Sequence, residues 1–477
     1  MKKPTKRRQR PKQAASEAAA LDRAFVWHPF TQMREWTSRS SDVTVITSGR
    51  GAVLRDDAGR EYLDGNSSIW TNLHGHRHPT IDRALRTQLA KLAHSSFLGL
   101  TNDVAPRLAE RLVRLMRAPG RKYRVFFSDD GSTAIEAALK MAVQARVQRG
   151  EPERVRFVSL ASGYHGDTVG AMSVGQSGQF HRPFKPIMFP TREVASPACY
   201  RCPFNKARPQ RGCDQRESRR CNWECVGELR RALDDSSQTI AALVMEPRVQ
   251  GPAGMWMHPP GYLKAAARLC RERGIWLLLD EVMTGFGRTG TMFACQKENV
   301  RPDLIALGKG ITGGYLPLAA TLASGEIFDA FNGEHNEFKT FFHGHSYSGN
   351  PLGCAAALAS LDVFAKEKVL AAISLKAGVL KKLSHRFWDH PNVGDVRQEG
   401  LICAVELVAD FETPASFPSD QRISHRVCAA ARKYGLLTRP IGDVLVLMPP
   451  YCTTARQLER MVAALWRAVN EVLPLKP

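Results

Sequence analysis

The sequence contains no apolar run close to the roughly 20 residues that a membrane-spanning helix needs. Its first residues also lack the apolar core of a secretory signal, and no internal repeat is apparent along the chain. These absences argue against a membrane-spanning protein, a secreted protein and a repeat array. We therefore expect a cytoplasmic protein with a sizeable core, consistent with 477 residues of which 43% are hydrophobic.

Acidic residues are scarce relative to basic ones, with 46 Asp and Glu against 67 Lys and Arg, a net charge of +21. Residues 1–12 alone supply seven positive charges and no acid. We expect residues 1–20 to form a basic, disordered tail without a role in the chemistry. Nonspecific contact with nucleic acid or an anionic surface is one alternative, and a transit peptide is another, although the segment has few serines.

Cysteine is concentrated in one place, because five of the eleven cysteines fall in an insert at residues 199–225: Cys199, Cys202, Cys213, Cys221 and Cys225. In an intracellular chain this density favours a metal or redox site over structural disulfides. The spacing is irregular, however, so we expect no metal here and keep a structural zinc or iron–sulfur cluster as the alternative. His74, His76 and His78 lie on a loop without a nearby pair of carboxylates, and we do not expect them to bind metal either.

The stretch LIALGKGITGGYLP, from Leu304 to Pro317, carries a single lysine, Lys309, at a glycine-rich turn. Its apolar start predicts a short buried strand that ends just before the lysine. Another apolar strand, Ile275 to Leu279, leads into Asp280, and parallel pairing would bring this carboxylate to the same edge. A buried amine can attack an aldehyde, and a buried carboxylate can hold a protonated ring nitrogen. The pair therefore predicts a site for pyridoxal phosphate.

A single lysine or a single acidic residue after a strand usually belongs to a solvated loop. The prediction of a cofactor site therefore depends on further features of the sequence. Two stretches, Gly285–Gly290 (GFGRTG) and His343–Pro351 (HGHSYSGNP), are rich in residues that let the backbone approach a ligand. Tyr164 follows another predicted strand and can stack its ring on a pyridine face. Arg439 lies at the end of a later strand, where its guanidinium could grip a carboxylate through two hydrogen bonds.

The segment from Val125 to Gln144 reads as a strand, a glycine turn and a helix, with Ser132 and Thr133 at the helix start and Glu136 shortly inside. Free N–H groups and the helix dipole attract an anion there, and Gly131 allows it to come close. A phosphate group would fit. An ordinary capped helix remains the alternative for this pattern taken alone.

Strands and helices alternate from Val125 to Leu307, which predicts an α/β protein with a mostly parallel, doubly wound sheet. Later strands predict a smaller α+β domain. We divide the chain into four parts: the tail 1–20, residues 21–80 as the N-terminal segment of the small domain with the substrate loop, residues 81–360 as the large domain, and residues 361–477 as the C-terminal small domain.

The ordered motifs WHPFTQM, GYHGDT, DEVMTGFGRTG, LGKGITGGYLP and HGHSYSGNP, from Trp27 to Pro351, resemble class III, fold-type I aminotransferases. The likeness covers nearly the whole chain from about Leu21. It implies a pyridoxal-phosphate enzyme that works as a homodimer with shared active sites, without specific nucleic acid or membrane. Within the family the likeness is greatest to the biotin-pathway branch, which converts 8-amino-7-oxononanoate to 7,8-diaminononanoate.

The resemblance also implies the roles of individual residues. Lys309 would bind the cofactor aldehyde and move protons, and Asp280 would hold the pyridine nitrogen protonated. Cofactor contacts would come from Gly131, Ser132, Tyr164 and Val282, with His345 and Ser346 from the other subunit. Substrate contacts would come from Phe30, Ile69, Trp70, Tyr164, Gly344 and the carboxylate clamp Arg439, while Arg288 would order its loop.

Two positions depart from forms of this branch that use S-adenosylmethionine as amino donor. Those forms commonly have tyrosine where this chain has Phe30 and tryptophan where it has Ile69. The donor is therefore S-adenosylmethionine or lysine. Another ω-amino-acid transaminase, acting on β-alanine, 4-aminobutyrate or a diamine, is the alternative function. A nucleic-acid-binding protein on an inactive scaffold is a third hypothesis, but retention of Lys309 and Asp280 argues against it.

Overall fold

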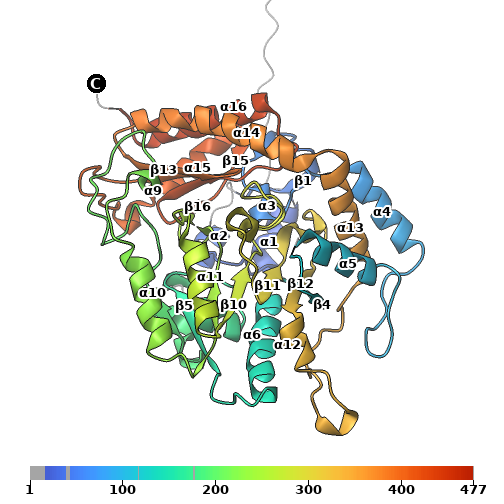
Figure 1. Ribbon diagram of the computed structural model, residues 1–477. Helices are drawn as coiled ribbons and strands as arrows, with labels where there is room; N and C mark the ends of the chain where they lie inside the picture. The colour runs from blue at the N-terminus through green and yellow to red at the C-terminus, as the bar shows by residue number, and fades with distance from the viewer. Residues whose placement is uncertain (1–16, 39–42, 117, 176–177, 476–477) are drawn as a thin grey trace, which may run out of the picture.

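The fold is described from a computed structural model, which covers residues 17–38, 43–116, 118–175 and 178–475 (Figure 1). The basic residues 1–16 lie outside this description, so the expectations for the tail stay predictions. Within the described part, no helix has both the length and the apolar character needed to cross a membrane.

A seven-stranded sheet forms the centre of the larger part of the molecule, in the order β4-β12-β11-β10-β7-β5-β6. Its strands are β4 (Tyr123–Ser128), β5 (Arg156–Leu160), β6 (Arg192–Val194), β7 (Ile240–Met245), β10 (Trp276–Asp280), β11 (Leu304–Leu307) and β12 (Ala319–Ser324). β12 runs antiparallel to both of its neighbours, whereas β11, β10, β7, β5 and β6 are parallel. The predicted α/β class with a mostly parallel sheet is confirmed.

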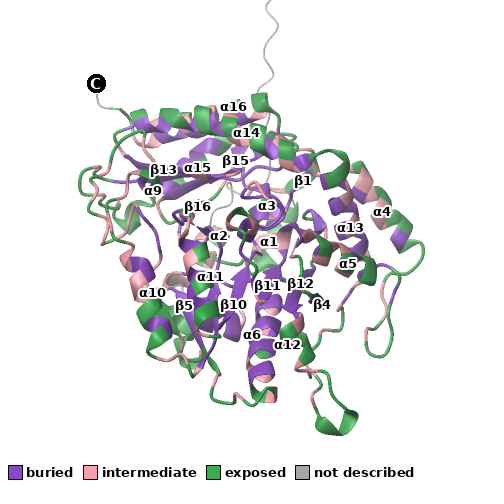
Figure 2. Cartoon of the chain, in the orientation of Figure 1, coloured by how far each residue is buried: buried purple, intermediate pink, exposed green. Residues whose placement is uncertain are grey.

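The central strands are apolar along their whole length because both faces of the sheet are covered. Every residue of β7, β10, β11 and β12 is buried, as the purple strands in the middle of Figure 2 show. Continuous runs such as IAALVM and WLLLD are typical of parallel strands between two helical layers. The longer helices are α4 (Pro79–Leu89), α5 (Ala105–Leu115), α6 (Gly131–Gln148), α10 (Glu224–Asp234), α11 (Tyr262–Glu272), α13 (Pro351–Lys366), α14 (Val369–Ser384), α15 (Ile423–Lys433) and α16 (Ala455–Val472).

Helix α6 begins at Gly131, after the two residues that follow β4. Its N-terminal cap differs from the one expected from the sequence. The N-cap is Asp130, whose carboxylate accepts a hydrogen bond from Thr133 N, while the Thr133 hydroxyl accepts one from Asp130 N. Glu136, expected to belong to the cap, instead accepts hydrogen bonds from the backbone of the helix α7 (Val169–Gly175), at Gly170 N and Ala171 N. Asp130 therefore stabilises the helix start and leaves Ser132 available for other contacts.

Segments far apart in the sequence meet in the two smaller sheets. One joins β1 (Ile46–Arg50), β2 (Val53–Asp56) and β3 (Glu61–Asp64) to the late strand β15 (Leu436–Leu437). The other has the order β13-β14-β17-β16, built from β13 (Val393–Glu399), β14 (Ile402–Leu407), β17 (Val444–Leu447) and β16 (Pro440–Ile441). The fourfold division of the chain stays a prediction, although β3 does pair with β15 as an N-terminal contribution to the C-terminal part would require.

The cysteine-rich insert is fastened to the β13–β14 hairpin by arginines. Arg201 donates to Glu406 on β14, and Arg216 pairs with Glu399 on β13 at 2.9 Å. All five cysteines of the insert are free thiols. In the described part of the chain, no group of three or more His, Cys, Asp or Glu side chains is arranged to hold a metal ion. The expectation of no metal in the insert, and its alternative of a structural cluster, both stay predictions.

Candidate active site

Parallel pairing of two neighbouring strands brings Asp280 and Lys309 to one edge of the sheet. β10 and β11 are in register with Asp280 opposite Ala306, and Lys309 follows β11 after Gly308. Both side chains line a cavity of about 670 Å³. The sequence-based expectation that these strands are parallel neighbours is confirmed, since the carboxyl ends of parallel strands open onto the same crevice.

Lys309 presents its amine to the inside of this cavity. Burial of the amine lowers its pKa, and the negative charges of Asp280 and Glu246 only partly oppose that effect. The indole ring of Trp70 lies over the amine, with 4.9 Å between Nζ and the ring centroid. A lysine with a lowered pKa can act as a nucleophile and as a proton carrier near neutral pH.

Asp280 is held by His165, a histidine of the GYHGDT motif to which the sequence assigned no more than a structural role in its loop. His165 Nδ1 donates to Asp280 Oδ2 at 2.7 Å, and Val282 N donates to Asp280 Oδ1 at 3.0 Å. Both side chains of the pair are buried. Burial alone would lower the pKa of His165, but the hydrogen bond to Asp280 and the charges of Asp280 and Glu246 raise it above its ordinary value. The pair thus fixes the position of the Asp280 carboxylate in the wall of the cavity.

Glu246 is a residue that sequence reasoning missed. It directly follows β7, just as Asp280 ends β10, so its place after a buried strand was the available signal. Its carboxyl accepts hydrogen bonds from Tyr164 N at 3.2 Å and Gly251 N at 2.8 Å. Burial raises the pKa of Glu246 to about 7, although the charge of His165 opposes this rise. Near neutral pH this carboxyl can therefore take up or release a proton.

The other end of the cavity is the start of helix α6, with Gly131 and Ser132. A Cβ atom at Gly131 would lie 2.5 Å from Val282, so only glycine fits there. The Ser132 hydroxyl contacts Thr168 Oγ1 at 2.7 Å and accepts from Thr168 N at 3.0 Å. The helix N-terminus suits an anion, the carboxylate suits a protonated ring nitrogen, and the amine suits an aldehyde. These three groups around one cavity fit pyridoxal phosphate.

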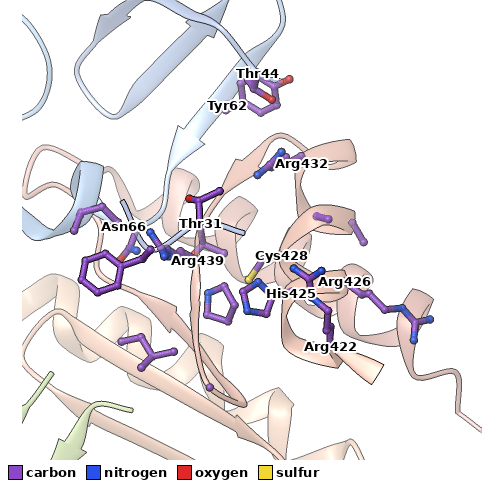
Figure 3. Close-up of a pocket in the computed structure, with 18 of the residues that line it drawn as sticks. Thr31, Thr44, Tyr62, Asn66, Arg422, His425, Arg426, Cys428, Arg432 and Arg439 are labelled. Atoms are coloured by element: carbon purple, nitrogen blue, oxygen red, sulfur yellow. The ribbon is translucent and has the colours of Figure 1, made fainter. Parts of the chain in front are cut away.

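A larger cavity of about 1710 Å³ opens outward from Lys309 and is lined by most of the expected substrate residues: Phe30, Ile69, Trp70, Tyr164 and Arg439. Arg439 lies between β15 and β16 and is exposed at the cavity wall. Figure 3 shows it near Asn66 and Thr31, with Arg422, His425 and Arg426 projecting from the region of helix α15. One wall of the cavity is therefore strongly basic. Another part of the lining is apolar, where Phe30 packs edge-on against Phe180 with 5.7 Å between the ring centroids.

Three expected residues lie elsewhere in the single chain. Gly344, His345 and Ser346 line neither cavity. His345 Nδ1 is 3.5 Å from Asp129, next to the start of α6. A role for His345 and Ser346 in the partner's site thus stays a prediction.

Arg288 is almost completely buried at 1% exposure and donates hydrogen bonds to backbone carbonyls. Its guanidinium reaches Trp70 O and Asn72 O at 3.3 Å each and Pro449 O at 3.0 Å. The expectation that Arg288 orders a loop agrees with these contacts, which tie GFGRTG to the residues around Trp70.

Comparison with known proteins shows which class of protein this fold and this site belong to. A family model described as aminotransferase class-III matches residues 36–469. The chain therefore belongs to the class-III aminotransferases. It is an aminotransferase, and membership of this family implies pyridoxal phosphate as cofactor.

The most similar relatives share one name. The adenosylmethionine-8-amino-7-oxononanoate aminotransferase of Geobacter sulfurreducens is 47% identical over 94% of this chain and 97% of its own length. The crystal structure of the enzyme of that name from Methanocaldococcus jannaschii has a TM-score of 0.88 at 40% identity, covering 95% of this chain and 98% of that one. An (S)-enantioselective ω-transaminase from Thermomicrobium roseum also has a TM-score of 0.88, at 32% identity, covering 97% of this chain and 99% of that one. The predicted fold-type I architecture is thereby confirmed.

We expect the His165 ring to titrate above its ordinary pKa of 6.5 in the cofactor-free protein, because its charged form is held by Asp280. A raised pKa means that this interaction stabilises the fold fully below about pH 6.5 and is lost as the pH rises through the folded value. NMR of ¹⁵N-histidine-labelled protein would measure the titration.

The variant Asp280→Asn should move the titration of His165 downward. His425 serves as an internal reference, because burial and the nearby charges of Arg422 and Arg439 lower its pKa. A His165 ring that titrates at or below 6.5 in the unsubstituted protein would contradict the proposed pairing.

Proposed function

We propose that this aminotransferase transfers an amino group to 8-amino-7-oxononanoate to give 7,8-diaminononanoate in biotin biosynthesis. The observation that carries the proposal is that Lys309 and Arg439 face one continuous cavity. A keto acid with its carboxylate several carbons from its ketone could reach both groups at once. The names of the relatives support the same acceptor.

Pyridoxal phosphate, when bound, supplies an aldehyde that takes up amino groups and a ring that accepts electrons. Lys309 would form the covalent link and carry the proton at the reacting carbon, because its lowered pKa leaves a share of neutral amine. Asp280, oriented by His165, would hold a proton on the ring nitrogen. Gly131 and Ser132 would bind the phosphate, while Val282 and Tyr164 would pack against opposite faces of the ring.

The proposal also concerns which molecule donates the amino group. The relatives' names contain adenosylmethionine, which favours this donor. Phe30 and Ile69, in the outer cavity, lack the hydroxyl and indole common in forms that use it, which favours lysine. We propose S-adenosylmethionine as the donor and keep lysine as the alternative. The resemblance in fold to an ω-transaminase supports a β-alanine, 4-aminobutyrate or diamine transaminase as the second candidate function.

A donor panel tests the function. Purified protein loaded with pyridoxal phosphate should convert 8-amino-7-oxononanoate with S-adenosylmethionine or lysine, measured by mass spectrometry of 7,8-diaminononanoate. Lys309→Ala should abolish this turnover, because the variant removes the amine that would both bind the cofactor aldehyde and carry the proton. Lys376→Ala is the matched control: burial also lowers the pKa of this half-buried lysine, but it lines neither cavity and should leave turnover unchanged.

The outcomes separate the candidates. Turnover of 4-aminobutyrate or a diamine without any turnover of 8-amino-7-oxononanoate would replace the first proposal by the second. Sustained turnover in Lys309→Ala would reassign the proton transfer to another residue.

Arg439→Ala should raise KM for the keto acid more than it lowers kcat, because the guanidinium would bind the carboxylate in the ground state and the transition state alike. Since Arg439 is exposed and solvent screens its charge, we expect a rise of about tenfold in steady-state kinetics.

Arg439→Lys should show a smaller rise, since it keeps the charge but loses the paired hydrogen bonds. The same KM in Arg439→Ala and the unsubstituted enzyme would place the carboxylate elsewhere in the cavity.

We also propose that two copies of the chain form a homodimer. Several large apolar side chains are exposed in two segments, one around His345 and one between helices α4 and α5: Phe338, Phe342 and Tyr347 in the first, Leu98 and Leu100 in the second. Large apolar side chains exposed in this way mark surfaces that partners cover, and we refer to these five as the apolar surface. A second copy would cover it and would bring His345 and Ser346 to the neighbouring phosphate site.

Sedimentation velocity tests the dimer. The protein should sediment as a dimer, and Phe342→Glu should shift it toward the monomer, because a charge would be buried in the interface. Leu375→Glu, at an equally exposed leucine of helix α14, should leave the dimer intact. A monomeric unsubstituted protein with full activity would overturn this part of the proposal.

A further inference from the structure

Four consecutive residues beside the amine site adopt the left-handed conformation, although none is glycine. The φ angles of Ser67, Ser68, Ile69 and Trp70 are 47°, 48°, 64° and 68°. L-residues rarely adopt this conformation singly and hardly ever in series, because Cβ then crowds the following carbonyl oxygen. A run of this kind persists only where the surroundings hold it, and such strain tends to occur at functional sites.

The middle of this left-handed turn is held by one buried carboxylate, Asp64, at the end of β3. Asp64 accepts hydrogen bonds from Ser68 N at 3.0 Å, from Ser68 Oγ at 2.9 Å and from Asn66 N at 3.3 Å. His76 Nε2 contacts the same carboxylate at 3.0 Å. Asp64 is only 2% exposed, so these partners replace the water that an ionised carboxylate requires.

The ends of the turn are fastened by neutral groups and by Arg288. Ser67 Oγ donates to Met448 O at 2.7 Å, and Trp70 Nε1 donates to Asn66 Oδ1 at 2.8 Å. Arg288 donates to Trp70 O. Asp64 thus contacts Ser68 in the middle of the turn through both N and Oγ, while Thr71 Oγ1 donates to Ser68 O at 3.0 Å.

The turn is also locked against the loop that carries Lys309. A Cβ atom at Gly314 would lie 2.7 Å from Asn72 Cα, and one at Gly310 would lie 3.0 Å from the Leu73 side chain. The segment directly after the turn, Asn72 and Leu73, therefore has little room to shift without moving this loop. The last residue of the turn, Trp70, places its ring 4.9 Å from Lys309 Nζ.

We propose that Asp64 is a positioning residue, which holds the left-handed turn and so fixes the indole face of Trp70 over the Lys309 amine. This inference rests on the proposed role of Lys309 in amino transfer. The indole face stabilises the amine whenever it is charged, and it closes one side of the space in which the amine can move. Loss of Asp64 would let the turn relax toward an ordinary conformation and displace the ring.

The test compares Asp64→Asn with Asp56→Asn. Asp56 is a matched control, because it is also 2% exposed and accepts hydrogen bonds from Ala58 N, Arg60 N, Arg60 Nε and Tyr62 OH, none of which belongs to the turn. Both variants remove one buried negative charge of the same kind. They differ in whether that charge contacts the turn.

The first measurement is ¹⁹F NMR of cofactor-free protein labelled with 5-fluorotryptophan, with the Trp70 signal assigned by Trp70→Phe. The Trp70 signal should move or broaden in Asp64→Asn and stay in place in Asp56→Asn. The second measurement is steady-state turnover, where a displacement of the ring by about 1 Å should lower kcat on the order of 100-fold. Asp56→Asn should keep kcat within a factor of about two, since Asp56 lines neither cavity and contacts no residue of the turn.

Each outcome decides the proposal. An unchanged Trp70 signal in Asp64→Asn overturns it, as does a moved signal with unchanged kcat, or equal effects of the two variants. If Asp64→Asn does not fold, Ser68→Ala removes one contact with the carboxylate and should move the same signal by less; no movement there also overturns it. An unsubstituted protein without amino transfer would contradict the proposed function, whereas the NMR comparison would still show whether Asp64 holds the turn.

Discussion

The site depends on the parallel pairing of β10 with β11. Both strands are buried along their whole length, so their register is set by the apolar side chains of the sheet and not by the polar residues that follow. This pairing carries Asp280 and Lys309 into one cavity, where exclusion of water lowers the pKa of the lysine and strengthens the contact between His165 and Asp280. The chemistry therefore follows from the packing of the core.

Residues at the ends of apolar strands could be predicted from the sequence, because strand and loop signals are local. Lys309, Asp280 and Tyr164 were found in this way, and the structure brings them to one cavity. The helix start at Gly131 was also predicted, but the residues predicted to cap it were wrong. Several polar side chains near this start could accept hydrogen bonds from the first N–H groups of the helix. Only the structure shows that Asp130 does so. Roles taken from the family resemblance stay predictions wherever no geometry bears on them.

His165 and Asp64 could not be found by such reasoning. The partner of His165, Asp280, is 115 residues away, and the partners of Asp64 lie on a turn whose conformation no local preference predicts. Buried hydrogen bonds between distant segments depend on how the layers pack, which a single sequence does not display. The resemblance to a family predicted which residues would contact ligands. The residues that hold them in position, His165 and Asp64, could be identified only from the structure.

The pairing of β3 with β15 has a consequence for how the chain is made. Asp64 ends β3 and lies opposite Leu437, more than 370 residues later in the sequence. On a ribosome, the early hairpin must wait for this late strand, and contacts between such distant residues form slowly. Until then the hairpin has an open edge, which is a point where nascent chains can associate wrongly. The sheet around β3 is therefore completed only when nearly the whole chain has been made.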